Sequence, residues 1–210
     1  MELILIRHGL PRRVEKQDGS AADPELSVEG VAQAERLARW MKTEHLDAIY
    51  SSPMMRARMT AAPLADLQRL DILIEPDVAE IDEHASTYIP LEELKEKEPE
   101  KWNELLKIGA EAYFDGIQDL ETFRRKVVGG IQRIIAGNKG KKAAVVCHGG
   151  IINIWAAHIL GMDKRLFFKP EYTSVNRFMA SGSGIHTLIS LNETGHLRNP
   201  TQMGAAGVEY

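Results

Sequence analysis

The sequence predicts an α/β protein of three layers, in which a mostly parallel sheet lies between helices on both faces, with one antiparallel strand and a helical lid insertion. Short apolar runs of strand length alternate with longer segments of helical periodicity, which is the pattern of such a sheet. Two of the runs, at residues 3–6 and 143–147, lead into the same pattern of a histidine followed by a glycine. Both runs lack polar residues, as is typical of strands that are buried on both faces.

The first part of the chain predicts alternating strands and helices. Ser27 is a suitable N-cap for a helix whose apolar positions run from Val28 to Met41. Pro53 is well placed to open a second helix. The strands expected in this part of the chain are residues 3–6, 46–50 and 72–74.

The second part of the chain contains the expected lid and the antiparallel strand. Residues 80–119 are charged and helix-prone, so we expect an insertion over one end of the sheet with most of its charges solvated. Residues 199–210 are small and polar, which favours a loose tail. We expect a single domain over residues 1–210. The remaining expected elements are a helix at 120–135, a strand at 143–147, a helix at 151–160 and an antiparallel hairpin formed by 174–179 and 184–191.

Composition argues against several classes of protein. The chain has 210 residues, a net charge of −4 and a pI near 6.0, so a general nucleic-acid-binding protein is not expected. Cys147 is the only cysteine, which excludes an intrachain disulfide and a cysteine-rich zinc site. The longest apolar stretch, 151–162, is too short to span a membrane, and we expect no signal peptide. A cytoplasmic protein is the expectation, and the sequence does not decide between a monomer and a homodimer.

Polar side chains follow the ends of the predicted parallel strands. Arg7 and His8 leave the first strand, and Arg56 lies in the opening turns of the helix after the second. Glu80 follows the third strand and His148 the fourth. Ligands of open α/β sheets bind beyond the carboxyl ends of the strands, so we expect these side chains to face one small molecule. The guanidinium group of arginine matches phosphate oxygens in geometry and charge, so these side chains together predict a site for a phosphate dianion.

Backbone groups are expected to complete this phosphate site. A helix follows His148, and the N–H groups at the start of a helix favour an anion. Gly9, Gly149 and Gly150 allow the backbone to approach the anion closely. The other histidines show no metal-ligand spacing, so no metal ion is expected. They are His45, His84, His158, His186 and His196.

Five blocks of the sequence follow the order and spacing of one known family. They are residues 5–9 (Leu-Ile-Arg-His-Gly), 23–34, 51–61, Glu80 and 145–152. In these blocks, which extend over most of the chain, the sequence resembles the histidine phosphatase superfamily, a phosphoglycerate mutase-like family that includes many phosphomonoesterases. The resemblance implies a hydrolase that acts on a small-molecule phosphate ester and uses no metal ion and no cofactor.

The resemblance also implies a role for each site residue. His8 is the expected nucleophile, which attacks phosphorus and forms a phosphohistidine. Arg7, Arg56 and His148 are expected to hold the phosphoryl oxygens and to stabilise their charge in the transition state. Glu80 is the expected general acid, which protonates the leaving oxygen and then removes a proton from the attacking water.

The leading hypothesis is therefore a phosphomonoesterase that hydrolyses a small phosphorylated metabolite. Many relatives carry an acidic residue or Gln, then Ser or Thr, after Arg-His-Gly, whereas this chain has Leu10 and Pro11. Val14 stands near the place of an asparagine that helps to hold phosphate in phosphoglycerate mutases. These departures favour hydrolysis over a mutase reaction. A phosphoglycerate-type mutase is the alternative, and a catalytically silent phospho-ligand-binding protein is another. The sequence does not identify the phosphate ester.

Several residues near the expected site have two interpretations. Asp82 and Glu83 lie within reach of the same loop as Glu80, so each is an alternative proton donor. Cys147 precedes His148, but strand alternation turns its side chain the other way, which favours a buried structural thiol. Four aromatic residues of the lid either contact the leaving group or form a small core of the insertion. They are Tyr88, Trp102, Tyr113 and Phe114.

Overall fold

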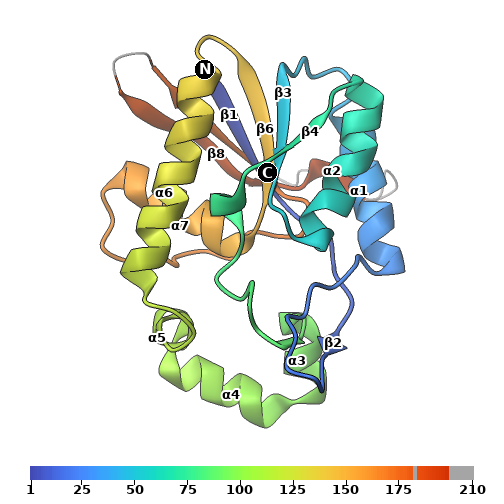
Figure 1. The fold of residues 1–210 in the computed structure, drawn as a ribbon, viewed down its shortest axis with the longest axis vertical. Helices are drawn as coiled ribbons and strands as arrows, with labels where there is room; N and C mark the ends of the chain where they lie inside the picture. The colour runs from blue at the N-terminus through green and yellow to red at the C-terminus, as the bar shows by residue number, and fades with distance from the viewer. Residues whose placement is uncertain (182–183, 199–210) are drawn as a thin grey trace, which may run out of the picture.

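The computed structural model describes residues 1–181 and 184–198, and it has an α/β fold built on a six-stranded sheet (Figure 1). The strand order from edge to edge is β4-β3-β6-β1-β7-β8. The strands are β1 (Glu2–Arg7), β3 (Ala48–Ser51), β4 (Ile72–Ile74), β6 (Lys142–Cys147), β7 (Val175–Ala180) and β8 (His186–Glu193). β7 pairs antiparallel with both of its neighbours, and the other pairs are parallel, so the prediction of one antiparallel strand is confirmed.

Helices cover both faces of the sheet, as the sequence predicts (Figure 1). They are α1 (Val28–Trp40) and α2 (Met55–Gln68) on one face, and α6 (Leu120–Gly137) and α7 (Gly149–Leu160) on the other. Strand β1 shows why its apolar run is uninterrupted. Leu3 and Leu5 lie in the core with α6 and α7, whereas Ile4 and Ile6 lie in the core with α1 and α2. Full burial of each such side chain stabilises the fold by about 1.5–3 kcal/mol.

Two helices begin at positions that differ from the prediction. Helix α2 begins at Met55 with Met54 as its N-cap, so the expectation that Pro53 opens the helix is wrong by two residues. Helix α7 begins at Gly149, two residues earlier than expected, with His148 as its N-cap. Strand β6 and α7 therefore meet at His148, which places this residue at the carboxyl end of the sheet. In the described part of the chain, no helix combines the length and the apolar character needed to cross a membrane.

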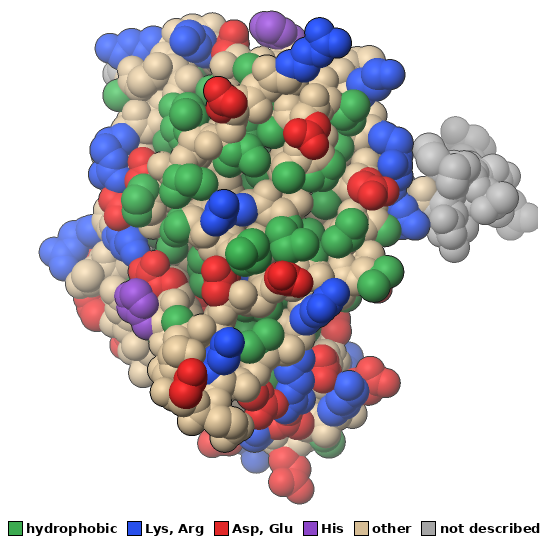
Figure 2. Space-filling view, turned by 45° about the vertical axis from the view of Figure 1, so that its right-hand side comes forward, with side chains coloured by type: hydrophobic (Ala, Val, Ile, Leu, Met, Phe, Trp, Pro, Cys, Tyr) green, Lys and Arg blue, Asp and Glu red, His purple; other side chains and the backbone are tan. Residues whose placement is uncertain are grey.

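A lid of three helices lies beyond the carboxyl ends of the parallel strands (Figure 1). The helices are α3 (Leu91–Lys97), α4 (Pro99–Ile108) and α5 (Ala110–Asp115), within the predicted insertion. Figure 2 shows acidic and basic side chains crowded over this lower part of the molecule. Ion pairs such as Glu93 with Lys97 lie at its surface. The function of these helices as a lid stays a prediction.

A second sheet joins the loop after β1 to the lid and was not predicted. Strand β2 (Val14–Glu15) pairs antiparallel with β5 (Thr87–Tyr88). Next to β2, the side chain of Arg13 forms ion pairs with Glu93 and Glu98 of the lid. Strands of two residues carry too little periodicity to be recognised in a sequence. The pairing fixes β5, and with it Tyr88, over the end of the main sheet.

Candidate active site

Strand β1 places His8 at the carboxyl end of the sheet. Its backbone N–H donates to Cys147 O at 3.0 Å, and its ring Nδ1 lies 2.7 Å from Gly9 O. A carbonyl oxygen only accepts, so Nδ1 carries the ring proton and Nε2 keeps the lone pair. Burial, followed by the charges of Arg56 and Arg7, lowers the pKa of His8. The ring is therefore neutral near pH 7, as a nucleophile must be.

The chain leaves His8 through a close approach of two glycines. A Cβ on Gly9 would lie 2.7 Å from Gly30 O, and a Cβ on Gly30 would lie 2.1 Å from Leu10 O. The start of α1 therefore requires glycine at position 9. The sequence suggested a different reason, which is a close approach of the backbone to the anion. The N–H of Gly9 donates to Thr60 Oγ1 at 2.9 Å. This donor is engaged, and a phosphate contact of Gly9 stays a prediction.

Arg7 lies beside His8, and a segment distant in sequence fixes its guanidinium. Nη1 donates to Pro170 O at 2.6 Å, and the guanidinium carbon lies 3.9 Å from the centroid of the Tyr172 ring. A cation–π contact of this kind stabilises by about 0.5–1 kcal/mol, and by more when it is desolvated. Arg7 Nε is buried and has no hydrogen-bond partner among the described residues. The side chain is thus held in place with a buried donor, Nε, unused.

Arg56 is the second guanidinium of the site and is 1% exposed. Its Nη2 donates to Asp82 Oδ1 at 2.8 Å, and its guanidinium carbon lies 4.6 Å from the centroid of the Tyr88 ring. Burial works to lower the pKa of Arg56, but Asp82 and the other acidic groups around the guanidinium together outweigh burial, so the pKa is raised. Nε and Nη1 are buried without a partner in the described part of the chain. Arg56 is therefore a fixed, permanent cation with two unused donors.

His148 faces His8 across the site, with 5.0 Å between the ring centroids. Its Nε2 lies 2.8 Å from Ser52 Oγ, and the same oxygen accepts the N–H of Met54 at 3.3 Å. The Ser52 hydroxyl can then donate its own proton to Nε2, which leaves the ring proton on Nδ1. Burial, followed by the charge of Arg56, lowers the pKa of His148. The ring is neutral, and its Nδ1 is a buried donor without a partner among the described residues.

These side chains together hold a cluster of unpaired buried nitrogens. The four atoms are Arg7 Nε, Arg56 Nε and Nη1, and His148 Nδ1. Buried polar atoms without a partner are rare, so a cluster of them needs a chemical reason. The charges of Arg7 and Arg56 act on both imidazole rings, which shows how close the groups lie. Two cations and one neutral ring donor, His148 Nδ1, beside the imidazole of His8 suit a phosphate dianion.

Glu80 reaches the start of α7 from the loop after β4. Its Oε2 accepts the N–H of Gly150 at 2.9 Å, and its Oε1 accepts the N–H of Ile81 at 3.0 Å. A Cβ on Gly150 would lie 2.4 Å from Oε1, so this position of the carboxyl requires glycine at 150. Burial, followed by the charge of Asp82, raises the pKa of Glu80. A raised pKa suits a group that must donate a proton at neutral pH.

The structure separates Glu80 from the two acids that the sequence left as alternatives. Asp82 binds Arg56, as described above, and Glu83 Oε1 accepts from Lys126 Nζ at 2.6 Å. Of the three carboxylates, Glu80 is the one that binds the first turn of α7. It is also 9% exposed, which fits a proton donor shielded from water. The geometry therefore favours Glu80 as the acid.

Residues 3–194 match the family model of the histidine phosphatase superfamily (branch 1). The chain belongs to this superfamily. The family predicted from the sequence is thereby confirmed. Phosphoserine phosphatase 1 of Hydrogenobacter thermophilus is 31% identical over 205 residues, which cover 94% of this chain and 94% of the relative.

Solved structures of the superfamily have the same fold. A mutant of the phosphoserine phosphatase of Entamoeba histolytica, in complex with phosphoserine, superposes with a TM-score of 0.72 and 25% identity. The match covers 94% of this chain and 99% of that one. A phosphoglycerate mutase of Bacillus anthracis superposes with a TM-score of 0.69 and 22% identity, over 94% and 95% of the two chains, which shows the fold alone.

This histidine phosphatase has two site residues that the sequence did not single out. Ser52 lies in a block that carried the family resemblance, but its contact with His148 depends on how β3 and β6 pair. Tyr172 lies outside every block. Its ring lies over Arg7 and 5.8 Å from the His8 ring, and its hydroxyl donates to Glu92 Oε2 at 3.1 Å. No sequence signal marks Tyr172, because its role comes from the path of the chain before β7.

The remaining candidates of the histidine phosphatase lie as follows. The Cys147 side chain packs in the core with α6 and α7, and burial raises its pKa, so the prediction of a buried thiol is confirmed. Tyr88 reaches the site, whereas Trp102 and Tyr113 lie on α4 and α5. The Phe114 side chain lies outside the described part. Among the described residues, no group of three His, Cys, Asp or Glu side chains could hold a metal ion.

Proposed function

We propose that this chain is a phosphomonoesterase that hydrolyses a small phosphorylated metabolite through a phosphohistidine at His8. The observation that carries the proposal is the cluster of unpaired buried nitrogens on Arg7, Arg56 and His148 beside a neutral imidazole. The nitrogens match the oxygens of a phosphoryl group, and the imidazole supplies a nucleophile. Glu80, with a raised pKa, supplies a proton at the same end of the sheet.

In the first step, His8 attacks the phosphorus atom. The lone pair of Nε2 forms the P–N bond while the ester P–O bond breaks, and the leaving oxygen takes the proton of Glu80. The Nδ1–H of His8 stays bound to Gly9 O, so the positive charge that develops on the ring is stabilised by a carbonyl dipole. The alcohol leaves, with a phosphohistidine and a Glu80 carboxylate in the site.

In the second step, water replaces the imidazole. The Glu80 carboxylate removes a proton from a water molecule, whose oxygen attacks phosphorus as the P–N bond breaks. Inorganic phosphate leaves, and His8 and Glu80 regain their starting protonation states. Through both steps, Arg7, Arg56 and His148 donate to the phosphoryl oxygens, and these fixed donors stabilise the charge of the transition state.

The substrate that we propose first is O-phosphoserine. The support is the phosphoserine phosphatase 1 of Hydrogenobacter thermophilus, which is similar over nearly the whole length of both chains. The complex of the Entamoeba histolytica enzyme with phosphoserine adds to it. The lid over the carboxyl end of the sheet also favours a small ester over a folded phosphoprotein (Figure 1).

The test measures phosphate release from O-phosphoserine and from p-nitrophenyl phosphate in EDTA, between about pH 5 and 8. Wild type should release phosphate, and His8→Ala should not. His45→Ala is the matched control, because the His45 side chain is 87% exposed and lies outside the site. Protein quenched during turnover should carry an acid-labile phosphoryl group in wild type and none in His8→Ala. Equal turnover by wild type and His8→Ala would contradict the proposal.

The same assay separates the two alternatives that the sequence left open. A mutase exchanges the phosphoryl group between positions of a phosphoglycerate with little net release of phosphate. A catalytically silent binding protein binds vanadate tightly and turns over neither ester. A homodimer and a cytoplasmic location stay predictions from the sequence, for which light scattering and cell fractionation are the measurements.

A further inference from the structure

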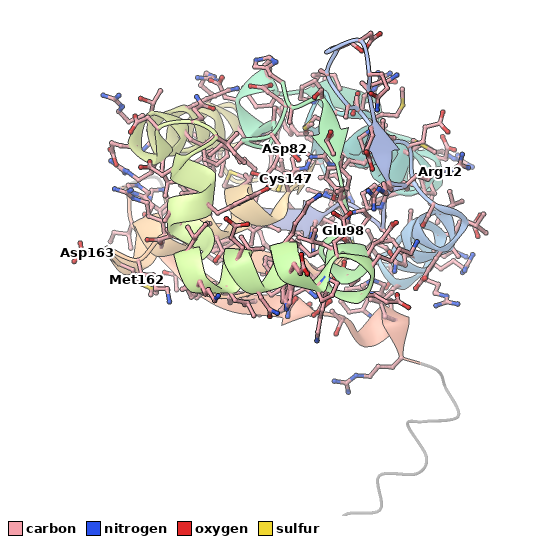
Figure 3. All side chains as sticks on the ribbon, turned by 90° about the horizontal axis from the view of Figure 1, so that it is seen from below. Arg12, Asp82, Glu98, Cys147, Met162 and Asp163 are labelled. Carbon is pink, nitrogen blue, oxygen red and sulfur yellow. The ribbon has the colours of Figure 1, made fainter. Side chains whose placement is uncertain are left out.

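Asp82 lies against the site and has no part in the two chemical steps. Its Oδ1 accepts from Arg56 Nη2 at 2.8 Å, and its side chain is 21% exposed. Seen from the lid side, Asp82 lies near the centre of the molecule, whereas Arg12 lies near its edge (Figure 3). Within the described residues, this is the one ion pair of Arg56. Asp82 is therefore the direct carboxylate partner of a phosphate-site cation.

We propose that Asp82 is a positioning residue, which aims the unused donors of Arg56 at the phosphoryl group. The proposal rests on the phosphatase function proposed above. Asp82 contacts the guanidinium directly. A second effect accompanies this contact, because the negative charge of Asp82 also acts on the neighbouring acid, Glu80.

The first effect follows from the geometry of Arg56. A guanidinium is planar, so fixing one nitrogen and one face fixes the directions of all its donors. Asp82 holds Nη2, and the Tyr88 ring lies over the guanidinium at 4.6 Å. Nε and Nη1 then stay buried without partners among the described residues, ready for phosphoryl oxygens. Without Asp82, the arginine would lose the one side chain that it donates to.

The groups that favour the charged form of Glu80 come from three elements. The charge of Arg56 acts from α2, the N–H of Gly150 donates from α7, and the N–H of Ile81 donates from the loop of Glu80 itself. Together they stabilise a carboxylate. A general acid placed among them needs an opposing influence to keep its proton.

Burial and Asp82 supply that opposing influence. Burial acts first, and the negative charge of Asp82 acts second, to raise the pKa of Glu80. The other titratable groups that interact with Glu80 are the Cys147 thiol from β6 and the Tyr88 phenol from β5. Burial raises the pKa of both, so both are neutral and add no charge. Asp82 is thus the charged residue that favours a proton on Glu80.

Three variants separate the two effects. Asp82→Asn removes the charge and keeps an oxygen that accepts from Arg56. Asp82→Ala removes both the charge and the acceptor. Glu83→Gln is the matched control, because it removes the same charge one residue later from a side chain that binds Lys126. The measurements are the pH dependence of kcat for O-phosphoserine and the Kd of inorganic phosphate by calorimetry, with thermal unfolding as the check on folding.

The expected results differ among the three variants. In Asp82→Asn, the pKa of Glu80 falls, so the alkaline limb of the kcat profile should move to lower pH by roughly 1 unit, while phosphate binding stays as tight or becomes tighter. Asp82→Ala should show the same movement and should weaken phosphate binding about tenfold, since Arg56 is no longer aimed. Glu83→Gln should match wild type in both measurements.

Phosphate binding by Asp82→Ala as tight as by wild type would overturn the aiming of Arg56. A kcat profile of Asp82→Asn that coincides with wild type, or an equal shift in Glu83→Gln, would overturn the effect of the Asp82 charge on Glu80. A loss of turnover in Asp82→Asn as deep as that of Glu80→Gln would overturn the positioning role, because it would make Asp82 the acid itself. If wild type hydrolyses no ester, the phosphatase function fails, and the phosphate affinities of Asp82→Ala and Glu83→Gln still test the aiming of Arg56. Should Asp82→Ala not fold, the profile of Asp82→Asn decides.

Discussion

Replacing Gly150 with alanine should displace the carboxyl group of Glu80 and slow the hydrolysis of alkyl phosphates about 10²-fold. The added Cβ would lie 2.4 Å from Glu80 Oε1 and 3.1 Å from its Cδ. Ordinary contact begins near 3.4 Å, so the carboxyl must move by about 1 Å, a misplacement that costs about two orders of magnitude in rate. The barrier would rise by about 2.7 kcal/mol.

The assay compares two leaving groups. The leaving group of O-phosphoserine is the alkoxide of serine, which needs a proton from the general acid. The leaving group of p-nitrophenyl phosphate is p-nitrophenolate, which leaves with little help from an acid. The fall in the hydrolysis rate of Gly150→Ala should therefore be large for O-phosphoserine and small for p-nitrophenyl phosphate. Gly149→Ala is the matched comparison, since its Cβ would meet Arg7 Nε at 3.8 Å and Pro170 Cδ at 4.0 Å. The fall in the rate of O-phosphoserine hydrolysis should be smaller in Gly149→Ala than in Gly150→Ala by about tenfold or more.

Equal losses on the two esters would refute the placement of Glu80 as the acid. Activity of Gly150→Ala within about threefold of wild type on O-phosphoserine would refute it as well. Thermal unfolding is the control. Alanine favours a helix interior by about 1 kcal/mol over glycine, which offsets part of the strain. A large fall in Tm would show that α7 itself has moved.

Two further predictions concern contacts around the site. Glu92 accepts from Lys169 Nζ at 2.8 Å and from the Tyr172 hydroxyl at 3.1 Å, so Glu92→Ala should raise KM about two- to fivefold with little change in kcat, as expected for an exposed pair. Glu96→Ala on the same helix should leave KM unchanged, and an equal effect in both would contradict the prediction. Burial lowers the pKa of His196 to about 4 from 6.5, so protonation favours the unfolded chain as the pH falls through this window. Tm measured by calorimetry should fall as the pH drops through this window, and it should fall less in His196→Gln. Parallel curves of Tm against pH for wild type and His196→Gln would contradict the prediction.

The fold was predictable because its signals are local. Residues 3–6 and 143–147 are apolar throughout because both faces of their strands are covered by helices. Ser27 was recognised as an N-cap, and its hydroxyl accepts the N–H of Gly30 at 3.0 Å. The predicted convergence of Arg7 and His148 followed from the rule that ligands bind beyond the carboxyl ends of parallel strands.

The partners of the site residues were not predictable, because they depend on contacts across the fold. Gly150 was expected to make room for an anion, and the structure shows that it makes room for the carboxyl of Glu80. The sequence offers Asp82 as an alternative proton donor, but its contact with Arg56 depends on the packing of the loop of residues 80–83 on α2. Tyr172 reaches Arg7 from a segment with no motif. Such pairings have no periodic signature in the sequence.

The site must keep His8 neutral and Glu80 protonated beside the same two cations. For His8, the charges of Arg56 and Arg7 follow burial directly as causes of its lowered pKa. For Glu80, burial and the charge of Asp82 come before two backbone N–H groups and the charge of Arg56, and its pKa is raised. Burial and Asp82 therefore keep the acid protonated although Arg56 favours its charged form. Activity should then rise with pH as His8 loses its proton and fall as Glu80 loses its own, so the alkaline limb of the profile reports Glu80.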